Sequence, residues 1–432
     1  MSMDSTYKRI FILIYCVSII GGALYHFTVL RGQPIAHEEG FIRRSEKSLF
    51  DLSFYASERP FTSDLFFKLC GSNPEYAVAG QKVMSLLCWS ILGLAAAALV
   101  PGPAARIVFY LLFFSLQFWW NIAAWNCIIR SESLSFSFFA AWLACVLFFL
   151  HKPSAQRLIL LSVISLFFSF IRDNLPYSVL LFALLLAVIA FICRLKQYKK
   201  YFTAYIMIMV VIFVLQSISC QVGKRHQFPL INVIFQRILP DEKYTQWFIE
   251  KGLPADDTLL RWKGKWGSSN DFALYRDGKY DKFMDWTLHE GKYVYAYFLL
   301  SHPRYTITTP LLAKDKLLSY NLFQYTYYNY PKDSRLSNWI DMVFLVLYGL
   351  LNFPAAIGLT LVSLYCFIKQ REMIYSIPTL LTATFLFNAM FIYHADAMEV
   401  SRHSLMNVIA FQTISCLALL LVYKQYRGGK RT

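Results

Sequence analysis

Apolar residues fall in long uninterrupted runs along this chain, and short polar stretches separate the runs. About 20 consecutive apolar residues are enough for an α-helix to cross a lipid bilayer. We therefore predict an α-helical polytopic membrane protein with about ten transmembrane helices. These runs lie at residues 10–30, 82–101, 104–120, 133–150, 155–171, 175–194, 201–219, 339–367, 373–393 and 404–423.

The run at 339–367 contains Asn352-Phe353-Pro354 near its middle. Because proline removes one helical hydrogen bond, we expect either one kinked helix or two short membrane segments there. The composition, 57% hydrophobic and 18% aromatic, agrees with a membrane protein and excludes a soluble domain with a large core.

The positive charges of the short connections favour one orientation in the membrane. Lys and Arg gather in cytoplasmic loops of membrane proteins. Here they gather on one side of the predicted helices, which makes both termini cytoplasmic. The residues concerned are Lys8, Arg9, Arg106, Lys152, Arg157, Arg194, Lys196, Lys199, Lys200, Lys369, Arg371, Lys424, Arg427, Lys430 and Arg431. The net charge of +16 follows from this bias, so it does not indicate nucleic acid as a partner.

Two long loops then lie outside the cell membrane, a first long loop at 31–80 and a second at 221–337. The second is rich in Trp, Tyr, Lys and Asp and is too long for an unstructured connection. We predict that it forms a small outer domain of mixed secondary structure. The chain would thus consist of a membrane module at 1–220, this outer domain at 221–337, and a second membrane module at 338–432.

Polar clusters at the helix ends all map to the outer side. They are AHEEGF (36–41), SERPFTSD (57–64), RSESLS (130–135), IRDNLPY (171–177) and HADAMEVSRH (394–403). Ionisable residues near membrane depth are candidates for function. Each cluster alone also fits a local ion pair, such as Arg172 with Asp173, Arg130 with Glu132, or Glu399 with Arg402 and His403 at helical spacing. Their gathering on one side favours a shared site.

Carboxylates and cations at the outer face suit sugar transfer from a lipid phosphate. The lipid tail of the donor lies in the bilayer and its phosphate lies at the interface. Arg or His donors hold the phosphate as negative charge develops on it. A carboxylate takes the proton from the attacking hydroxyl of the acceptor. Attack opposite the leaving phosphate inverts the anomeric centre.

Four stretches of the sequence resemble the GT-C superfamily of integral-membrane glycosyltransferases, in particular bacterial members that use polyprenyl-phosphate sugars. In order they are ERPFTSDLFFKLCGSNPE (58–75), SESLSFS (131–137), RDNLPY (172–177) and MEVSRHS (398–404). The resemblance implies a catalytic carboxylate in the first long loop. It points to Glu39 as the base, with Glu38 second, although related proteins tend to have an Asp in this region. Asp51 is a third candidate, but its stretch LFDLSFY indicates an amphipathic helix at the interface.

The same resemblance suggests Arg402 and His403 as ligands of the donor phosphate, followed by Arg172. Residues expected to support the site are Arg59, Glu132, Asp173, Asp396 and Glu399. Asp396 and Glu399 would orient Arg402 and His403, or bind a divalent cation such as Mg²⁺ or Mn²⁺. No other cofactor is expected.

The expected activity is an inverting hexosyltransferase of the bacterial inner membrane. It would move a hexose from an undecaprenyl phosphate carrier to an envelope glycan. This acceptor would be the O-antigen of lipopolysaccharide or a lipid-linked oligosaccharide. The donor, this acceptor and membrane lipids are the expected partners.

Two alternatives stay open. An O-antigen polymerase or ligase would depend on arginines of its outer loops. A transporter of lipid-linked glycans is disfavoured, because the sequence shows no internal repeat and no charge in the middle of a predicted span.

Overall fold

A computed structural model describes most of the 432 residues. The described residues are 5–30, 36–37, 39–194, 198–318, 339, 342–343, 346, 353–398 and 400–428.

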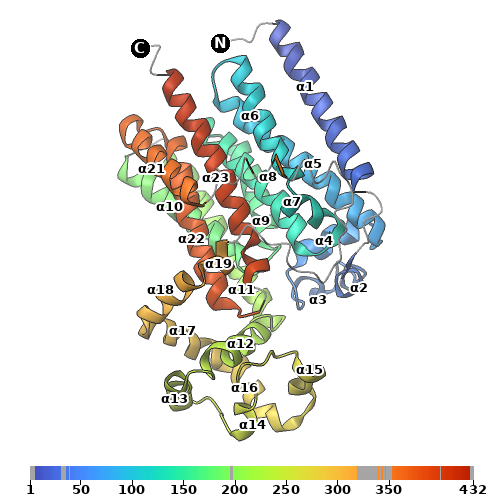
Figure 1. The fold of residues 1–432 in the computed structure, drawn as a ribbon, viewed down its shortest axis with the longest axis vertical. Coiled ribbons are helices and arrows are strands. Elements are labelled where there is room, and N and C mark those ends of the chain that lie inside the picture. The colour runs from blue at the N-terminus through green and yellow to red at the C-terminus, as the bar shows by residue number, and fades with distance from the viewer. Residues whose placement is uncertain are drawn as a thin grey trace.

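The protein is an integral membrane protein built on a bundle of apolar helices (Figure 1). Within the described ranges, eight helical segments are long and apolar enough to cross a membrane, and a bent pair of helices adds a ninth. The long helices of the bundle are α1 (Ser5–Leu24), α5 (Pro74–Leu99), α8 (Ser131–His151), α10 (Leu175–Ile192), α11 (Lys199–Val222), α21 (Phe353–Gln370), α22 (Ile377–Ala395) and α23 (Val400–Gly428).

The bent pair occupies the third predicted span. Helix α6 (Pro103–Ser115) continues to Phe118, and the chain then turns by 57° into α7 (Trp120–Ala123) and a short 3-10 turn (Ala124–Cys127). Where the bent pair ends, Gln81 of α5 donates its side-chain amide to the backbone carbonyls of Asn126 and Ile128. Such internal partners are what an irregular backbone needs inside a membrane protein.

One other predicted span differs from expectation, and one lies partly outside the described residues. Helix α9 (Ala155–Ser169) has 15 residues and is shorter than a full membrane span. Helix α21 begins at Phe353, so the predicted kink at Asn352-Phe353-Pro354 lies partly outside the described residues.

The first long loop is folded against the bundle. It contains β1 (Ala36–His37), α2 (Glu39–Ser45), α3 (Leu52–Tyr55) and α4 (Phe61–Leu69). Pro60 directly precedes α4, as its fixed backbone angle favours. At the start of α3, the side chains of Phe50 and Leu52 are 99% and 83% exposed, as expected for a helix that lies on a lipid surface.

The second long loop is helical in its described part, and no strand occurs between residues 221 and 318. The prediction of mixed secondary structure is therefore wrong for these residues. The helices are α12 (Gln227–Val233), α13 (Glu242–Glu250), α14 (Asp257–Leu260), α15 (Ser269–Arg276), α16 (Asp281–His289), α17 (Gly291–Ser301), α18 (Pro303–Leu312) and α19 (Lys314–Leu318). Aromatic residues fill its core, where the Phe235 ring stacks on Trp262 and Phe283, each at 5.4 Å.

Both long loops lie at the same end of the bundle. Figure 1 shows that α1 begins and α23 ends at one end, whereas α2 to α4 and α12 to α16 lie at the other, which we call the loop end. At the opposite end, His151 lies within electrostatic range of Lys152, Arg157 and Lys424. Lys and Arg side chains therefore gather at this end, opposite the two long loops.

The two long loops touch at Gly223, which ends α11. A Cβ atom at this position would overlap the carbonyl oxygen of Ser57 and lie 2.8 Å from its carbonyl carbon. Backbone cannot move aside as a flexible side chain can, so only glycine fits here.

We expect Gly223→Ala to destabilise the protein by roughly 1–3 kcal/mol, because overpacking against backbone forces the two loops apart. Gly358→Ala in α21 is the matched control, since its added methyl group meets no atom within 4 Å. Thermal unfolding in detergent should show a lower midpoint for Gly223→Ala alone. Equal midpoints for the two variants would contradict the contact.

Candidate functional site

The site centres on the buried carboxylate of Glu132 in the first turn of α8. Its Oε1 accepts a 2.8 Å hydrogen bond from Nη1 of Arg402, which lies in the first turns of α23. Nη1 of Arg172, from the turn between α9 and α10, lies 3.8 Å from the same oxygen. The exposed fractions of these side chains are 1% for Glu132, 12% for Arg402 and 8% for Arg172. Three segments far apart in sequence therefore meet at one carboxylate.

Two further arginines contribute charge to this site. Arg130 acts electrostatically on Glu132, and Arg59 from the first long loop acts on Arg172 and His403. We call these side chains the arginine cluster: Arg59, Arg130, Arg172, Arg402, Glu132 and His403.

His403 is neutral in this arrangement. Nη2 of Arg402 lies 3.2 Å from Nε2 of His403. A guanidinium group only donates hydrogen bonds, so this nitrogen is the acceptor and carries no proton. The imidazole can then offer its other nitrogen as a donor to a ligand.

Among the described side chains, the arginine cluster gathers four guanidinium groups and the single carboxylate of Glu132. Among the described residues, neither Nη1 of Arg172 nor Oε2 of Glu132 has a hydrogen-bond partner, although both atoms are buried. Buried polar atoms without partners cost stability, so their presence points to a polar ligand. The excess of arginines favours an anion, and phosphate suits the planar guanidinium.

The structure brings Arg172, Glu132, Arg402 and His403 together. The local ion pair expected between Arg172 and Asp173 does not form, and the pair expected for Glu399 lies outside the described residues. Asp173 instead accepts a 2.9 Å bond from Nε of Arg225 and a 2.8 Å bond from the amide of Gln216. Glu132 is buried and bonds across the bundle, so it is neither solvated nor limited to Arg130.

Asp396 faces the second long loop and does not orient Arg402 or His403 as expected. Its carboxylate accepts a hydrogen bond from the backbone of Met398, 2.9 Å away. Its backbone carbonyl accepts one from Arg237 of the second long loop, at 3.1 Å. Burial raises the pKa of Asp396 to about 6. The turn at the end of α22 is thus held by the outer helices.

The described residues contain no group of three or more His, Cys, Asp or Glu side chains close enough to hold a metal ion. Glu399, the other acid expected to bind a cation, lies outside the described residues. The cation site expected at Asp396 and Glu399 therefore stays a prediction.

The acids of the first long loop occupy different environments. Glu38 lies outside the described residues. Glu39 is the first residue of α2, and the side chain of Glu39 is not described. The loop reaches the arginine cluster through β1, which pairs in parallel with β2 (Ile128–Ile129) so that His37 is opposite Ile129. Arg130 follows directly in the chain. The loop with the predicted base thus meets the segment that leads into Glu132.

Asp51, the third candidate, serves as the N-cap of α3. It is exposed and accepts hydrogen bonds at 2.8 Å from both the backbone and the hydroxyl of Ser53. These bonds lower the pKa of Asp51. A carboxylate whose pKa is lowered is a weaker base, which disfavours Asp51 as the catalytic group.

Asp64 is an acid to which the sequence analysis gave no role. It lies in α4 with 1% of its side chain exposed, and its Oδ2 is 3.2 Å from Nε of Arg44 in α2. Burial raises the pKa of Asp64 to about 6, despite the opposing charge of Arg44. The only sequence signal was its place in the stretch ERPFTSD, beside Arg59.

The pair Arg44–Asp64 fixes the helix that begins at Glu39. The Arg44 guanidinium packs closely on Gly40 and lies over the ring of Phe41, 4.9 Å from its centre. Arg59 lies over the same ring at 4.6 Å. The aromatic ring therefore connects α2 to the arginine cluster, and Asp64 is a positioning residue for α2.

The fold and the site define an integral membrane protein with a buried, arginine-rich cluster at the loop end of its helix bundle. Comparisons of the chain with protein-family models and with curated proteins find no match.

We expect Asp64→Asn to change how stability depends on pH. The pKa of Asp64 is raised in the folded state, so its contribution to stability is greatest at acidic pH and is lost as pH rises through about 6. The wild type should therefore lose up to about 3 kcal/mol relative to Asp64→Asn between pH 4 and pH 8. Unfolding midpoints over this range measure the effect.

Glu58→Gln is the control for this experiment, because Glu58 is exposed in the same loop. It should follow the pH profile of the wild type. A constant difference between wild type and Asp64→Asn across the range would show that Asp64 does not titrate as described.

Proposed function

We propose that the protein is an inverting glycosyltransferase that moves a hexose from a polyprenyl phosphate to an envelope glycan. The carrying observation is the arginine cluster, where four arginines surround one buried carboxylate at the loop end of a membrane bundle. A phosphate group on a lipid presents its charge at this depth, where the tail stays in the bilayer and the head reaches the guanidinium groups.

Arg402, His403 and Arg172 are the proposed ligands of the donor phosphate. As the bond from the sugar to phosphate breaks, negative charge grows on the leaving phosphate. Fixed guanidinium groups in a buried site stabilise that charge without reorganising. Glu132 holds Arg402 and Arg172 in position through its Oε1. Arg59 belongs to the first long loop, acts electrostatically on His403 and lies over the ring of Phe41 in α2.

Glu39 is the proposed base, with Glu38 second. Base and phosphate ligands must lie on opposite sides of the sugar for inversion, and they come from different segments of the chain. The pairing of β1 with β2 brings the loop of Glu39 to the entrance of α8. The clamp between Arg44 and Asp64 supports the helix that begins at Glu39.

The proposed location is the bacterial inner membrane, with both termini in the cytoplasm and the loop end facing outward. Support comes from the basic residues at the end opposite the long loops.

Arginines of the second long loop also suit the second candidate, an O-antigen polymerase or ligase. Arg225 and Arg237 belong to that loop, and both contact the membrane helices.

We expect the double variant Glu38→Gln/Glu39→Gln to abolish sugar transfer. Neutral amides cannot take the proton of the acceptor hydroxyl, and loss of a general base lowers rates by roughly 10²–10⁴-fold. The assay uses purified protein in lipid with a panel of polyprenyl-phosphate hexoses and envelope glycan extract, and it follows release of polyprenyl phosphate.

Glu75→Gln, an exposed acid at the start of α5, is the matched control and should keep full activity. Release of polyprenyl phosphate by the double variant would agree with a glycosyltransferase but would show that neither Glu38 nor Glu39 is its base. No release by the wild type with any donor would overturn the proposal in favour of a polymerase, ligase or transporter.

We expect Arg402→Lys to weaken the donor interaction by about 10–100-fold in kcat/KM, since a lysine keeps the charge but loses the planar pair of donors. Arg304→Lys in the exposed part of α18 is the control for the same change. Unchanged donor kinetics in Arg402→Lys would remove Arg402 from the phosphate site.

A further inference from the structure

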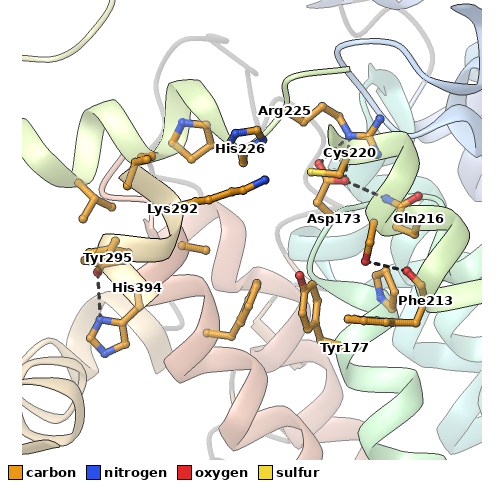
Figure 2. Close-up of a pocket in the computed structure, with 17 residues that line it drawn as sticks. Asp173, Tyr177, Phe213, Gln216, Cys220, Arg225, His226, Lys292, Tyr295 and His394 are labelled. Carbon is orange, nitrogen blue, oxygen red and sulfur yellow. Dashed lines mark hydrogen bonds and ion pairs between the residues drawn. The ribbon is translucent and has the colours of Figure 1, made fainter. Parts of the chain in front are cut away.

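A second site lies where the second long loop meets the membrane helices. A cavity of about 230 Å³ opens between the loop ends of α10, α11 and α22 on one side and helices α12 and α17 on the other (Figure 2). It lies beside Asp173, whereas the neighbouring Arg172 belongs to the arginine cluster. One turn of the chain therefore serves two separate sites.

Basic side chains line one part of this cavity. Arg225 is 8% exposed, and it is held by Asp173 through Nε and by the carbonyls of Ser57 and Ser219 through Nη1. Lys292 of α17 extends across the cavity toward Asp173 and contacts the side-chain oxygen of Gln221 (Figure 2).

Several buried polar atoms around this cavity have no hydrogen-bond partner among the described residues. They include Nη2 of Arg225, Nε2 of His226 and Oε1 of Gln216. Arg225 and Gln216 are both more than nine-tenths buried. Such atoms carry a desolvation cost that a bound polar group would remove. Two of the three belong to basic residues, so an anion fits them best.

Aromatic side chains form the opposite part of the cavity. Tyr177 of α10 packs against Phe213 of α11 at 4.9 Å and against Phe391 of α22 at 4.5 Å between ring centres. Tyr177 and Phe391 lie near the loop ends of apolar helices, at the level expected for the membrane interface, and Phe213 lies farther along α11. The cavity thus combines an apolar floor toward the bilayer with a basic rim toward the outer helices.

We propose that this cavity binds the phosphate-bearing head of a membrane lipid, with the adjoining part of its tail against Tyr177, Phe213 and Phe391. The charge balance favours phosphate, since Arg225 and Lys292 face one carboxylate, that of Asp173. The apolar floor distinguishes a lipid phosphate from free phosphate. The volume holds the head and the first part of a chain, and the remainder stays in the bilayer.

This assignment deepens the proposed function and rests on it for the identity of the lipid. The arginine cluster takes the donor phosphate, so a second lipid phosphate would belong to the acceptor. The acceptor class is then a lipid-linked phosphosaccharide rather than a free glycan. Arg225 and its partner Asp173 link this lipid to the turn that carries Arg172.

Photocrosslinking tests the cavity without any sugar transfer. The full-length protein is placed in nanodiscs of a neutral lipid with a trace of phosphatidic acid that carries a diazirine near the top of its acyl chain. Labelled peptides are mapped by mass spectrometry. We expect labels on the peptides with Tyr177, Phe213 or Phe391, and a several-fold loss of labelling in Lys292→Gln.

Lys243→Gln, an exposed lysine in α13, is the matched control and should label as the wild type does. Equal labelling by a diazirine diacylglycerol, which lacks phosphate, would overturn the basic part of the proposal. Full competition by millimolar inorganic phosphate would identify a free-anion site and overturn the lipid. No label on these three peptides would overturn the whole assignment.

Transfer kinetics separate this proposal from the proposed function. With a lipid-linked acceptor, Lys292→Gln should raise the acceptor KM several-fold and leave the donor KM unchanged. An unchanged acceptor KM beside a positive crosslink would overturn the acceptor identity and keep the lipid site. Absence of transfer in the wild type beside a positive crosslink would refute the glycosyltransferase and leave the lipid site standing.

Discussion

The site depends on the contacts of the buried Glu132 carboxylate with Arg402 and Arg172. This carboxylate joins α8 to the start of α23, 270 residues later in the chain, and to the turn before α10. Removal of a partner from a buried ionic group costs far more than an exposed ion pair is worth. Among the described residues, the contact that closes the bundle therefore also gathers guanidinium groups at one place.

The second long loop is fixed to the membrane helices by two arginines. Arg225 bonds to Asp173 and to the carbonyl of Ser57, and Arg237 bonds to carbonyls at the end of α22 and lies over the ring of Tyr393. Each guanidinium offers five donors, so one side chain can hold several backbone carbonyls in place. The outer helices are therefore fixed to the bundle and form one wall of the cavity.

The sequence was sufficient for features that depend on local pattern. Apolar runs located the long helices, and polar clusters on one side predicted that Arg172, Glu132, Arg402 and His403 would meet. It was insufficient where partners are distant in the chain. Asp173 bonds to Arg225, Asp64 bonds to Arg44, and Asp396 turns toward Arg237, and no spacing rule links these pairs. The carbonyls of Asn126 and Ile128 likewise bond to the distant side chain of Gln81.

The turn at Arg172 and Asp173 shows why adjacent opposite charges need not pair. Backbone geometry directs the two side chains to different sides of the turn, and each finds a stronger partner in a buried environment. Arg172 faces the arginine cluster and Asp173 faces the cavity beneath the outer helices. Any ligand that displaces Asp173 from Arg225 would therefore act on the same rigid turn that positions Arg172. The arginine cluster and the proposed lipid cavity are thus joined by one peptide bond, the bond between Arg172 and Asp173.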